Sequence, residues 1–216
     1  MNWFFVDMAL CLLFAAQHSL LTTQPAVRVI EKITRPQLWN LVFSVLTVVV
    51  MVFIYWTWQP SGISIYSLEG GWYIMVFGFH MFFIFMFFYC FKYTSFWQWL
   101  GTSQALHILM GRELPRYYKI NRTGLKRYVR FPHHTFLILM FWAQPAMTAD
   151  TLLLAIAGTV YTWLGTMHQD TRGLRVLGDA WADYSRETHI LVPSLRRLLA
   201  DWRLIRGSAA MQSHTE

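Results

Sequence analysis

The chain has 216 residues, of which 56% are apolar, 18% aromatic and only 13% charged, and its formal net charge is +7. Soluble domains carry about 25% charged residues, so this composition excludes an ordinary soluble globular protein. It predicts an all-α integral membrane protein.

Five apolar runs are candidates for transmembrane helices, because a helix needs about 20 such residues to cross a hydrocarbon core roughly 30 Å thick. In chain order they cover residues 3–20, 38–58, 71–93, 135–147 and 151–167. The fourth run is short and becomes adequate only if Pro132, His133 and His134 belong to the same helix. We expect a single membrane domain, residues 1–206, followed by a disordered tail at 207–216.

The segments between and after these runs predict helices outside the hydrocarbon core. Residues 26–37 place apolar side chains on one helical face and basic ones on the other, which is typical of a helix lying on the inner leaflet. Residues 95–110 suit a second interfacial helix or a re-entrant segment. Residues 169–206 predict two cytoplasmic helices divided by Pro193.

The positions of the basic residues predict the orientation. Of the 18 Lys and Arg residues, three lie in 21–37, seven in 112–130 and seven in 172–206, whereas 59–70 and 147–150 contain none. The positive-inside rule then places the N-terminus outside and the C-terminus in the cytoplasm, after five crossings. Topology and contact with anionic lipid account for the net charge, so we expect no nucleic-acid partner.

Ionisable residues near the ends of the runs are the candidate functional groups, because such groups are costly at membrane depth. In this topology, five of them share one depth at the cytoplasmic boundary. They are His18, His133, His134, His168 and Asp170. Hydration or a bond to a nearby carbonyl explains any single histidine there, but four imidazoles at one level are more than an interface requires.

Two interpretations use this cluster. The first is a pocket for a polar cofactor at the inner leaflet. The second is a metal or haem site with His18, His133, His134 and His168 as ligands, since imidazole commonly binds metals and haem iron. The chain has no Cys-x-x-Cys or His-x-x-x-His pair to support the metal site.

The second half of the chain carries a recognisable pattern. Gly124-Leu125, Arg127-Tyr128, Arg130 and Pro132 precede the string Phe141-Trp142-Ala143-x-Pro145-x-Met147-Thr148, and Gly178, Trp181, Tyr184 and Pro193 follow it. This pattern resembles the isoprenylcysteine carboxyl methyltransferase-like membrane enzymes, and most closely the bacterial methanethiol S-methyltransferases and their NnrU-type relatives. The resemblance covers most of the chain and is weakest across 80–120.

The resemblance implies methyl transfer from S-adenosylmethionine to a small or lipophilic thiol of the methanethiol type, in a bacterial inner membrane. It places the cofactor under the cytoplasmic ends of the last two runs. Arg130, His134, Asp170 and Tyr184 would contact the cofactor, with Arg130 on its carboxylate and the acidic group on its ammonium. His18 would line the substrate side, and no catalytic residue is assigned.

The chain departs from the family pattern at two places. Where the family reads Arg-His-Pro-x-Tyr-x-Gly, this chain has Arg130-Phe131-Pro132-His133-His134-Thr135-Phe136, and Gln169-Asp170 replace two glutamates. Phe136 in place of glycine would fill cofactor space. Two alternatives therefore stay open beside the methyltransferase: a haem- or metal-binding NnrU-like protein, and a non-catalytic subunit whose aromatic third run packs against other membrane proteins.

Overall fold

The computed structural model describes residues 2–93, 95–113, 120–195 and 197–202. This part of the chain is mostly helical with almost no sheet, which confirms the predicted all-α class. The tail predicted to be disordered, residues 207–216, lies outside the described residues.

Five helices form the body of the protein, and shorter elements connect them. The five are α1 (Asn2–Leu20), α3 (Trp39–Thr57), α4 (Gly70–Tyr89), α7 (Pro132–Trp142) and α8 (Ala149–Leu177). The shorter helices are α2 (Gln24–Ile33), α5 (Phe96–Trp99), α6 (Thr102–Leu109) and α9 (Asp179–Glu187), with 3-10 turns at Pro36–Leu38, Cys90–Tyr93 and Gly124–Arg127. Residues 195 and 197–202 are also helical. The two strands are β1 (Ser64–Ser67) and β2 (Ala146–Thr148).

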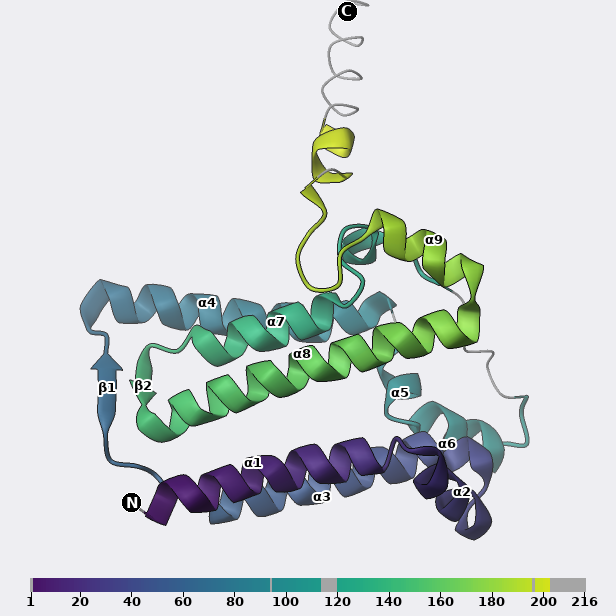
Figure 1. Cartoon of the computed structure of the whole chain (residues 1–216), viewed down its shortest axis with the longest axis horizontal. Coiled ribbons are helices and arrows are strands. Elements are labelled where there is room, and N and C mark those ends of the chain that lie inside the picture. Colours follow the sequence, from purple (N-terminus) through teal and green to yellow (C-terminus); the bar gives the residue numbers. More distant parts are fainter. Residues whose placement is uncertain (1, 94, 114–119, 196, 203–216) are drawn as a thin grey trace, which may run out of the picture.

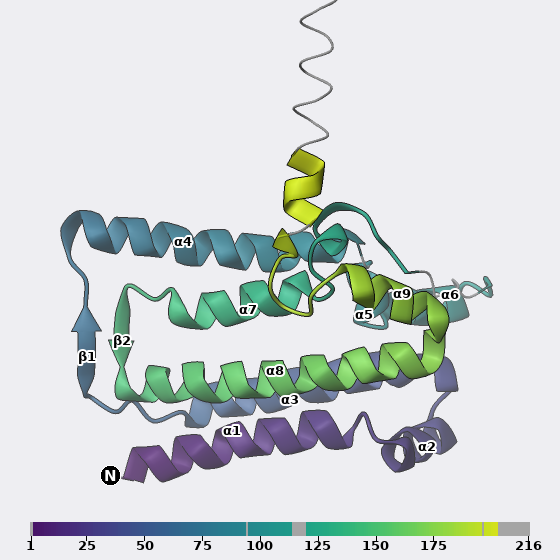
Figure 2. The same cartoon turned by 45° about the horizontal axis from the view of Figure 1, so that its top comes forward.

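The five helices lie side by side in a stack (Figures 1 and 2). Helix α7 packs between α4 and α8, α8 also packs on α1, and α1 packs on α3. The strands β1 and β2 lie at one end of the stack, whereas α2, α5, α6 and α9 gather at the other end. The polar residues of interest belong to this second end.

Three helices are long and apolar enough to cross a membrane, counted over the described residues: Asn2–Leu20, Trp39–Thr57 and Gly70–Lys92. The chain is therefore a membrane protein. Helix α7 has 11 residues and is only about 17 Å long, whereas α8 has 29 residues but is more polar. Crossing by α7 and α8, and with it the predicted total of five spans, stays a prediction.

The fourth and fifth predicted runs have different ends in the structure. Helix α7 does include Pro132 to His134, but it ends at Trp142 rather than 147. Pro145 explains this end, since a proline lacks the amide hydrogen and restricts the residue before it. Helix α8 continues ten residues past the predicted end at 167, and stops at Gly178, whose positive φ of 55° is readily adopted only by glycine.

A short antiparallel strand pair, which the sequence did not predict, joins the two hairpin loops at the end of the stack opposite α9. Strand β1 pairs with β2 through Ser64 and Thr148, Tyr66 and Met147, and Ser67 and Ala146. Beside it, the Asp150 carboxylate accepts hydrogen bonds from the Trp58 indole and from the backbone and hydroxyl of Ser61. Burial alone would raise the pKa of Asp150, but these bonds lower it to about 2. The ionised Asp150 therefore anchors the start of α8 to Trp58 and Ser61.

Candidate functional site

A buried ion pair lies where the start of α7 meets the second half of α8. Arg130, two residues before α7, lies with its Nη1 atom 3.3 Å from Oδ1 of Asp170 on α8, and their side chains are 7% and 21% exposed. The Trp181 indole on α9 donates to the same Asp170 oxygen at 3.0 Å. The structure thus brings together two of the residues predicted to bind a cofactor, although 40 positions separate them in sequence.

Backbone pairing fixes the position of Arg130. Its amide donates to the His189 carbonyl at 3.0 Å, and the Phe131 amide donates to the Ile190 carbonyl at 3.2 Å. The guanidinium itself is incompletely paired: within the described part of the chain, neither Nε nor Nη1 makes a hydrogen bond, and both atoms are buried. Buried donors without acceptors are rare, and a bound anion is one explanation for them.

Close packing of α9 on α8 positions Asp170. A Cβ atom on Gly173 would lie 2.5 Å from the Trp181 ring, so the indole fits against α8 only because residue 173 is glycine. Gly178 turns the chain back between the two helices. Trp181 can therefore reach Asp170 one turn earlier on α8, and its hydrogen bond fixes the orientation of the carboxylate.

Tyr184 packs against Trp181 and holds it in place. Its hydroxyl donates to the Lys126 carbonyl at 2.6 Å, and its ring contacts Trp181 edge to face at 5.5 Å. The Arg122 guanidinium also lies over the Tyr184 ring, 5.7 Å from its centre. Burial raises the pKa of Tyr184 to about 12, although nearby arginines oppose the shift, so the hydroxyl stays protonated and keeps donating. Tyr184 was predicted to contact a cofactor, but in this structure its hydroxyl is engaged with the backbone.

His134 projects from α7 toward α8. Its Nδ1 atom lies 2.8 Å from the Thr166 hydroxyl, which donates its hydrogen to the Thr162 carbonyl at 2.6 Å. Because that hydrogen is already used, Nδ1–H of His134 must be the donor, and Nε2 carries the lone pair. The Phe131 ring stacks on the imidazole with a centroid separation of 5.7 Å and an angle of 13°. His134 is thus a fixed neutral imidazole between α7 and α8.

The other three predicted histidines differ in their placement. His18 on α1 lies among the rings of Phe14, Phe43 and Tyr161. The His133 ring lies 4.1 Å from that of His134 and 5.9 Å from Phe91, on the side of the Cys90–Tyr93 turn. His168 is exposed, and it points away from α7 because it lies two residues after Thr166 on the same helix.

These positions do not assemble the predicted metal or haem ligands. Residues 2–93, 95–113, 120–195 and 197–202 contain no group of three or more His, Cys, Asp or Glu side chains that could hold a metal ion. The metal interpretation of His18, His133, His134 and His168 is therefore not carried further.

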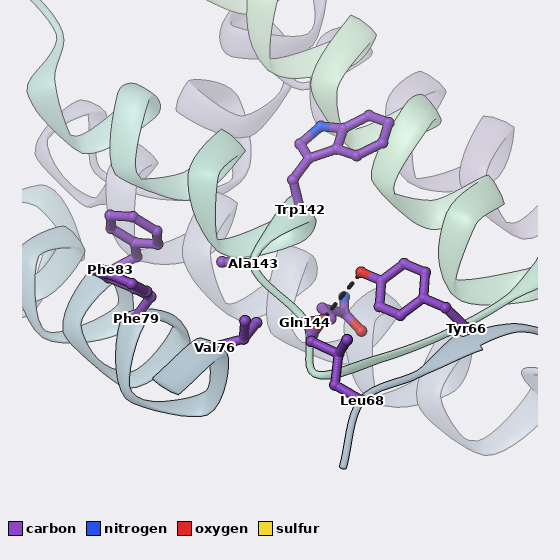
Figure 3. Close-up of a pocket in the computed structure, with 8 residues that line it drawn as sticks. All are labelled: Tyr66, Leu68, Val76, Phe79, Phe83, Trp142, Ala143 and Gln144. Carbon is purple, nitrogen blue, oxygen red and sulfur yellow. Dashed lines mark hydrogen bonds between the residues drawn. The ribbon is translucent and has the colours of Figure 1, made fainter. Parts of the chain in front are cut away.

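A pocket of about 580 Å³ lies at the other end of the protein, between α4, the end of α7 and the strands. Figure 3 shows its lining, which is mostly apolar and includes Phe79, Phe83 and Trp142. The Tyr66 hydroxyl at its edge donates to the Gln144 carbonyl at 3.0 Å. With no charged side chain among its lining residues, this pocket does not offer partners for a charged cofactor.

Comparison with known proteins identifies relatives that match most of the chain. The chain is 26% identical to the methanethiol S-methyltransferase of Pseudomonas deceptionensis, over 89% of this chain and 73% of that protein. It is 28% identical to methanethiol S-methyltransferase 2 of Bradyrhizobium diazoefficiens, over 88% and 73%. It is 27% identical to the methanethiol S-methyltransferase of Mycobacterium tuberculosis, over 87% and 77%. The chain is a homologue of the methanethiol S-methyltransferases. No family model and no solved structure matches it.

This relationship confirms the resemblance seen in the sequence. It also bears on the departures from the family pattern. Phe136, expected to fill cofactor space, stacks instead on Phe83 of α4 at 6.3 Å, on the side of α7 opposite His134. The phenyl ring therefore does not lie between α7 and α8.

Sequence reasoning missed two residues that build the site. Thr166 orients His134, and Gly173 admits the Trp181 ring against α8. Both lie on the α8 face that carries Asp170, at offsets of four and three residues from it. That spacing was available in the sequence, and it would have indicated a shared face had α8 been predicted to extend past residue 167.

Proposed function

We propose that the protein is an S-adenosylmethionine-dependent membrane methyltransferase that acts on a small or lipophilic thiol. The homology to proteins named methanethiol S-methyltransferase supports the reaction class. The observation that carries the site is the buried Arg130–Asp170 pair, in which Nη1 of Arg130 contacts the carboxylate while the buried Nε makes no hydrogen bond. A cation and an anion side by side match the carboxylate and ammonium of the amino-acid end of the cofactor.

The residues fit that group in their chemistry. Arg130 would bind the cofactor carboxylate through its buried Nε atom, which makes no hydrogen bond, and Asp170 would bind the ammonium while Trp181 holds it in place. His134 would face the cofactor from α7, and Tyr184 would act through Trp181. When bound, S-adenosylmethionine supplies a methyl group already activated by the positive sulfur. The protein therefore has to position and deprotonate the acceptor rather than activate the donor.

The proposal predicts that the full chain, reconstituted in lipid, binds S-adenosylmethionine and its demethylated product with one site per chain. Adenosine, which lacks the amino-acid end, should bind at least about 10-fold more weakly because it leaves the Arg130–Asp170 pair unused. Isothermal titration calorimetry measures all three. Transfer of a labelled methyl group to methanethiol tests the reaction directly. Failure of both sulfur-containing ligands to bind in lipid would reject the proposed function.

We also propose that the chain lies in a bacterial inner membrane with its N-terminus outside and its C-terminus in the cytoplasm. Clustering of the basic residues in 112–130 and 172–206 supports this orientation. In a background with Cys11 and Cys90 replaced by serine, Glu69→Cys should react with an impermeant maleimide in intact cells. Asp183→Cys should react only after permeabilisation. Equal labelling of both positions in intact cells would contradict this topology.

A further inference from the structure

An aromatic box formed by three helices surrounds His18. The Phe14 ring of α1 stacks on the imidazole at 5.3 Å, Phe43 of α3 contacts it at 4.6 Å, and Tyr161 of α8 meets it edge on at 6.0 Å. A contact between Ser19 Oγ and the Tyr161 hydroxyl, 3.1 Å apart, holds that ring in place. The box is therefore a built feature of the packing of α1, α3 and α8.

Polar atoms in this apolar setting have no partners within the described residues. Nδ1 of His18 and both amide heteroatoms of Gln17 are buried and make no hydrogen bond. An unpaired buried polar group costs about 1–3 kcal/mol, so several neighbouring ones require an explanation. A ligand with a single weak hydrogen-bond donor and an otherwise apolar surface would satisfy His18 Nδ1 and still suit the aromatic walls.

Space exists on the side of α8 that faces the box. Gly165 follows Tyr161 by four residues and so lies on nearly the same helical face, one turn closer to Asp170. Nothing lies within 4 Å of the position that a Cβ atom on Gly165 would take. Free volume therefore exists beside Gly165 itself, one turn from Tyr161 toward Asp170.

His134 connects the box to the ion pair. It is bonded to Thr166, which lies between Tyr161 and Asp170 on α8, and it interacts electrostatically with His18. At 1.5 Å per residue, Tyr161 and Asp170 are about 14 Å apart along the helix axis. A cofactor anchored by its amino-acid end at Asp170 would extend toward His134 and the box.

We propose that this aromatic box is the acceptor subsite and that His18 Nδ1 takes the proton of a small, uncharged thiol. The inference rests on the proposed methyl transfer and names its acceptor class and its proton acceptor. Aromatic rings favour contact with sulfur and alkyl groups, whereas Phe14, Phe43 and Tyr161 offer no cation to pair with a carboxylate acceptor.

The step balances in atoms and electrons. The thiol S–H bond breaks, and its proton moves to the lone pair of His18 Nδ1. The resulting thiolate attacks the methyl carbon, so a new sulfur–carbon bond forms as the bond to the positive donor sulfur breaks. The products are a neutral dialkyl sulfide and the demethylated cofactor, and imidazolium then releases its proton to water. The titratable groups facing His18 are Tyr161 from α8 and His134 from α7, whereas α3 contributes the ring of Phe43.

The test compares His18→Gln with wild type in lipid, using methyl transfer to ethanethiol from pH 6.5 to 10 and calorimetric binding of S-adenosylhomocysteine. Glutamine keeps an acceptor atom but takes no proton. We expect binding within about 2-fold of wild type and a rate about 100-fold lower at pH 7. The rate should recover as the pH approaches the thiol pKa, about 8.5 or higher, because solution then supplies thiolate. His107→Gln, whose imidazole bonds to the Ser103 carbonyl of its own helix, is the matched control and should behave as wild type.

Two outcomes would overturn the inference while leaving the proposed function intact. One is His18→Gln activity equal to wild type at every pH, and the other is a loss of activity that no rise in pH relieves. A second variant, Gly165→Leu, fills the free volume. It should raise the KM for ethanethiol at least about 10-fold with S-adenosylhomocysteine binding unchanged, and an unchanged KM would likewise reject the subsite. Wild type that binds no S-adenosylhomocysteine would reject both the subsite and the proposed function.

Discussion

Replacement of Arg130 by glutamine is expected to lower the affinity for S-adenosylhomocysteine at least about 100-fold and to remove measurable methyl transfer. The variant loses the guanidinium that would pair with the cofactor carboxylate, and it also leaves Asp170 without its cation at 3.3 Å. Loss of a buried charge pair with the ligand costs about 2–5 kcal/mol, which is the origin of the expected affinity factor. Removal of one partner of the buried Arg130–Asp170 pair also lowers the stability of the fold by about 3–5 kcal/mol. Titration calorimetry and thermal unfolding of the reconstituted protein measure the two effects.

A conservative variant separates binding from folding. Arg130→Lys keeps the positive charge beside Asp170 and should recover much of the thermal stability. It loses the planar fork that binds a carboxylate through two nitrogen atoms, so its ligand affinity should remain low. If Arg130→Lys binds as tightly as wild type, the guanidinium geometry is not what recognises the cofactor.

Arg127 provides the matched control. It has the same side chain three residues earlier and also forms an ion pair, with Asp201, but its side chain is 49% exposed. Exposed pairs contribute about 0–1 kcal/mol, so Arg127→Gln should change ligand affinity by no more than about 3-fold. A loss of affinity as large as that of Arg130→Gln would show that the whole basic segment, rather than the buried pair, governs binding.

Much of the helical framework follows from the sequence because apolar composition is a local property. The helices α1, α3 and α4 match predicted runs to within a few residues, since each is a continuous stretch that only a helix can carry through lipid. The strand pair β1–β2 was not predicted, because its formation depends on pairing between segments about 80 residues apart, which no local pattern encodes. The end of α7 was also placed wrongly, although Pro145 marks it in the sequence.

In the site, too, some features follow from the local sequence and others depend on neighbouring helices. His18, His134 and Asp170 were predicted to share one depth, and Arg130 was predicted to bind the same cofactor as Asp170. The structure pairs Arg130 with Asp170 at 3.3 Å. The depth argument failed for His168, because a residue at the right level on α8 still points away when it lies two positions after Thr166. Depth comes from hydropathy, whereas direction around a helix requires knowledge of the neighbouring helix.

Gly173→Ala is expected to weaken S-adenosylhomocysteine binding about 30- to 100-fold, although residue 173 has no polar side chain. The added methyl carbon would lie 2.5–2.8 Å from three atoms of the Trp181 ring, well inside contact distance. An indole cannot bend away as a flexible chain end can, so the ring must move and its bond to Asp170 must break. Loss of a positioned carboxylate then costs about 2–3 kcal/mol of ligand binding.

Helical stability opposes this loss, which makes the result informative. Alanine favours a helix over glycine by about 1 kcal/mol, so a purely local effect would stabilise α8. Gly78→Ala on α4 is the control, since nothing lies within 4 Å of its added carbon and affinity should be unchanged. The double variant Gly173→Ala with Trp181→Leu relieves the clash but lacks the indole donor, so it should regain stability without regaining affinity. Recovery of full affinity in the double variant would show that Trp181 does not position Asp170, and that Gly173 serves helix packing alone.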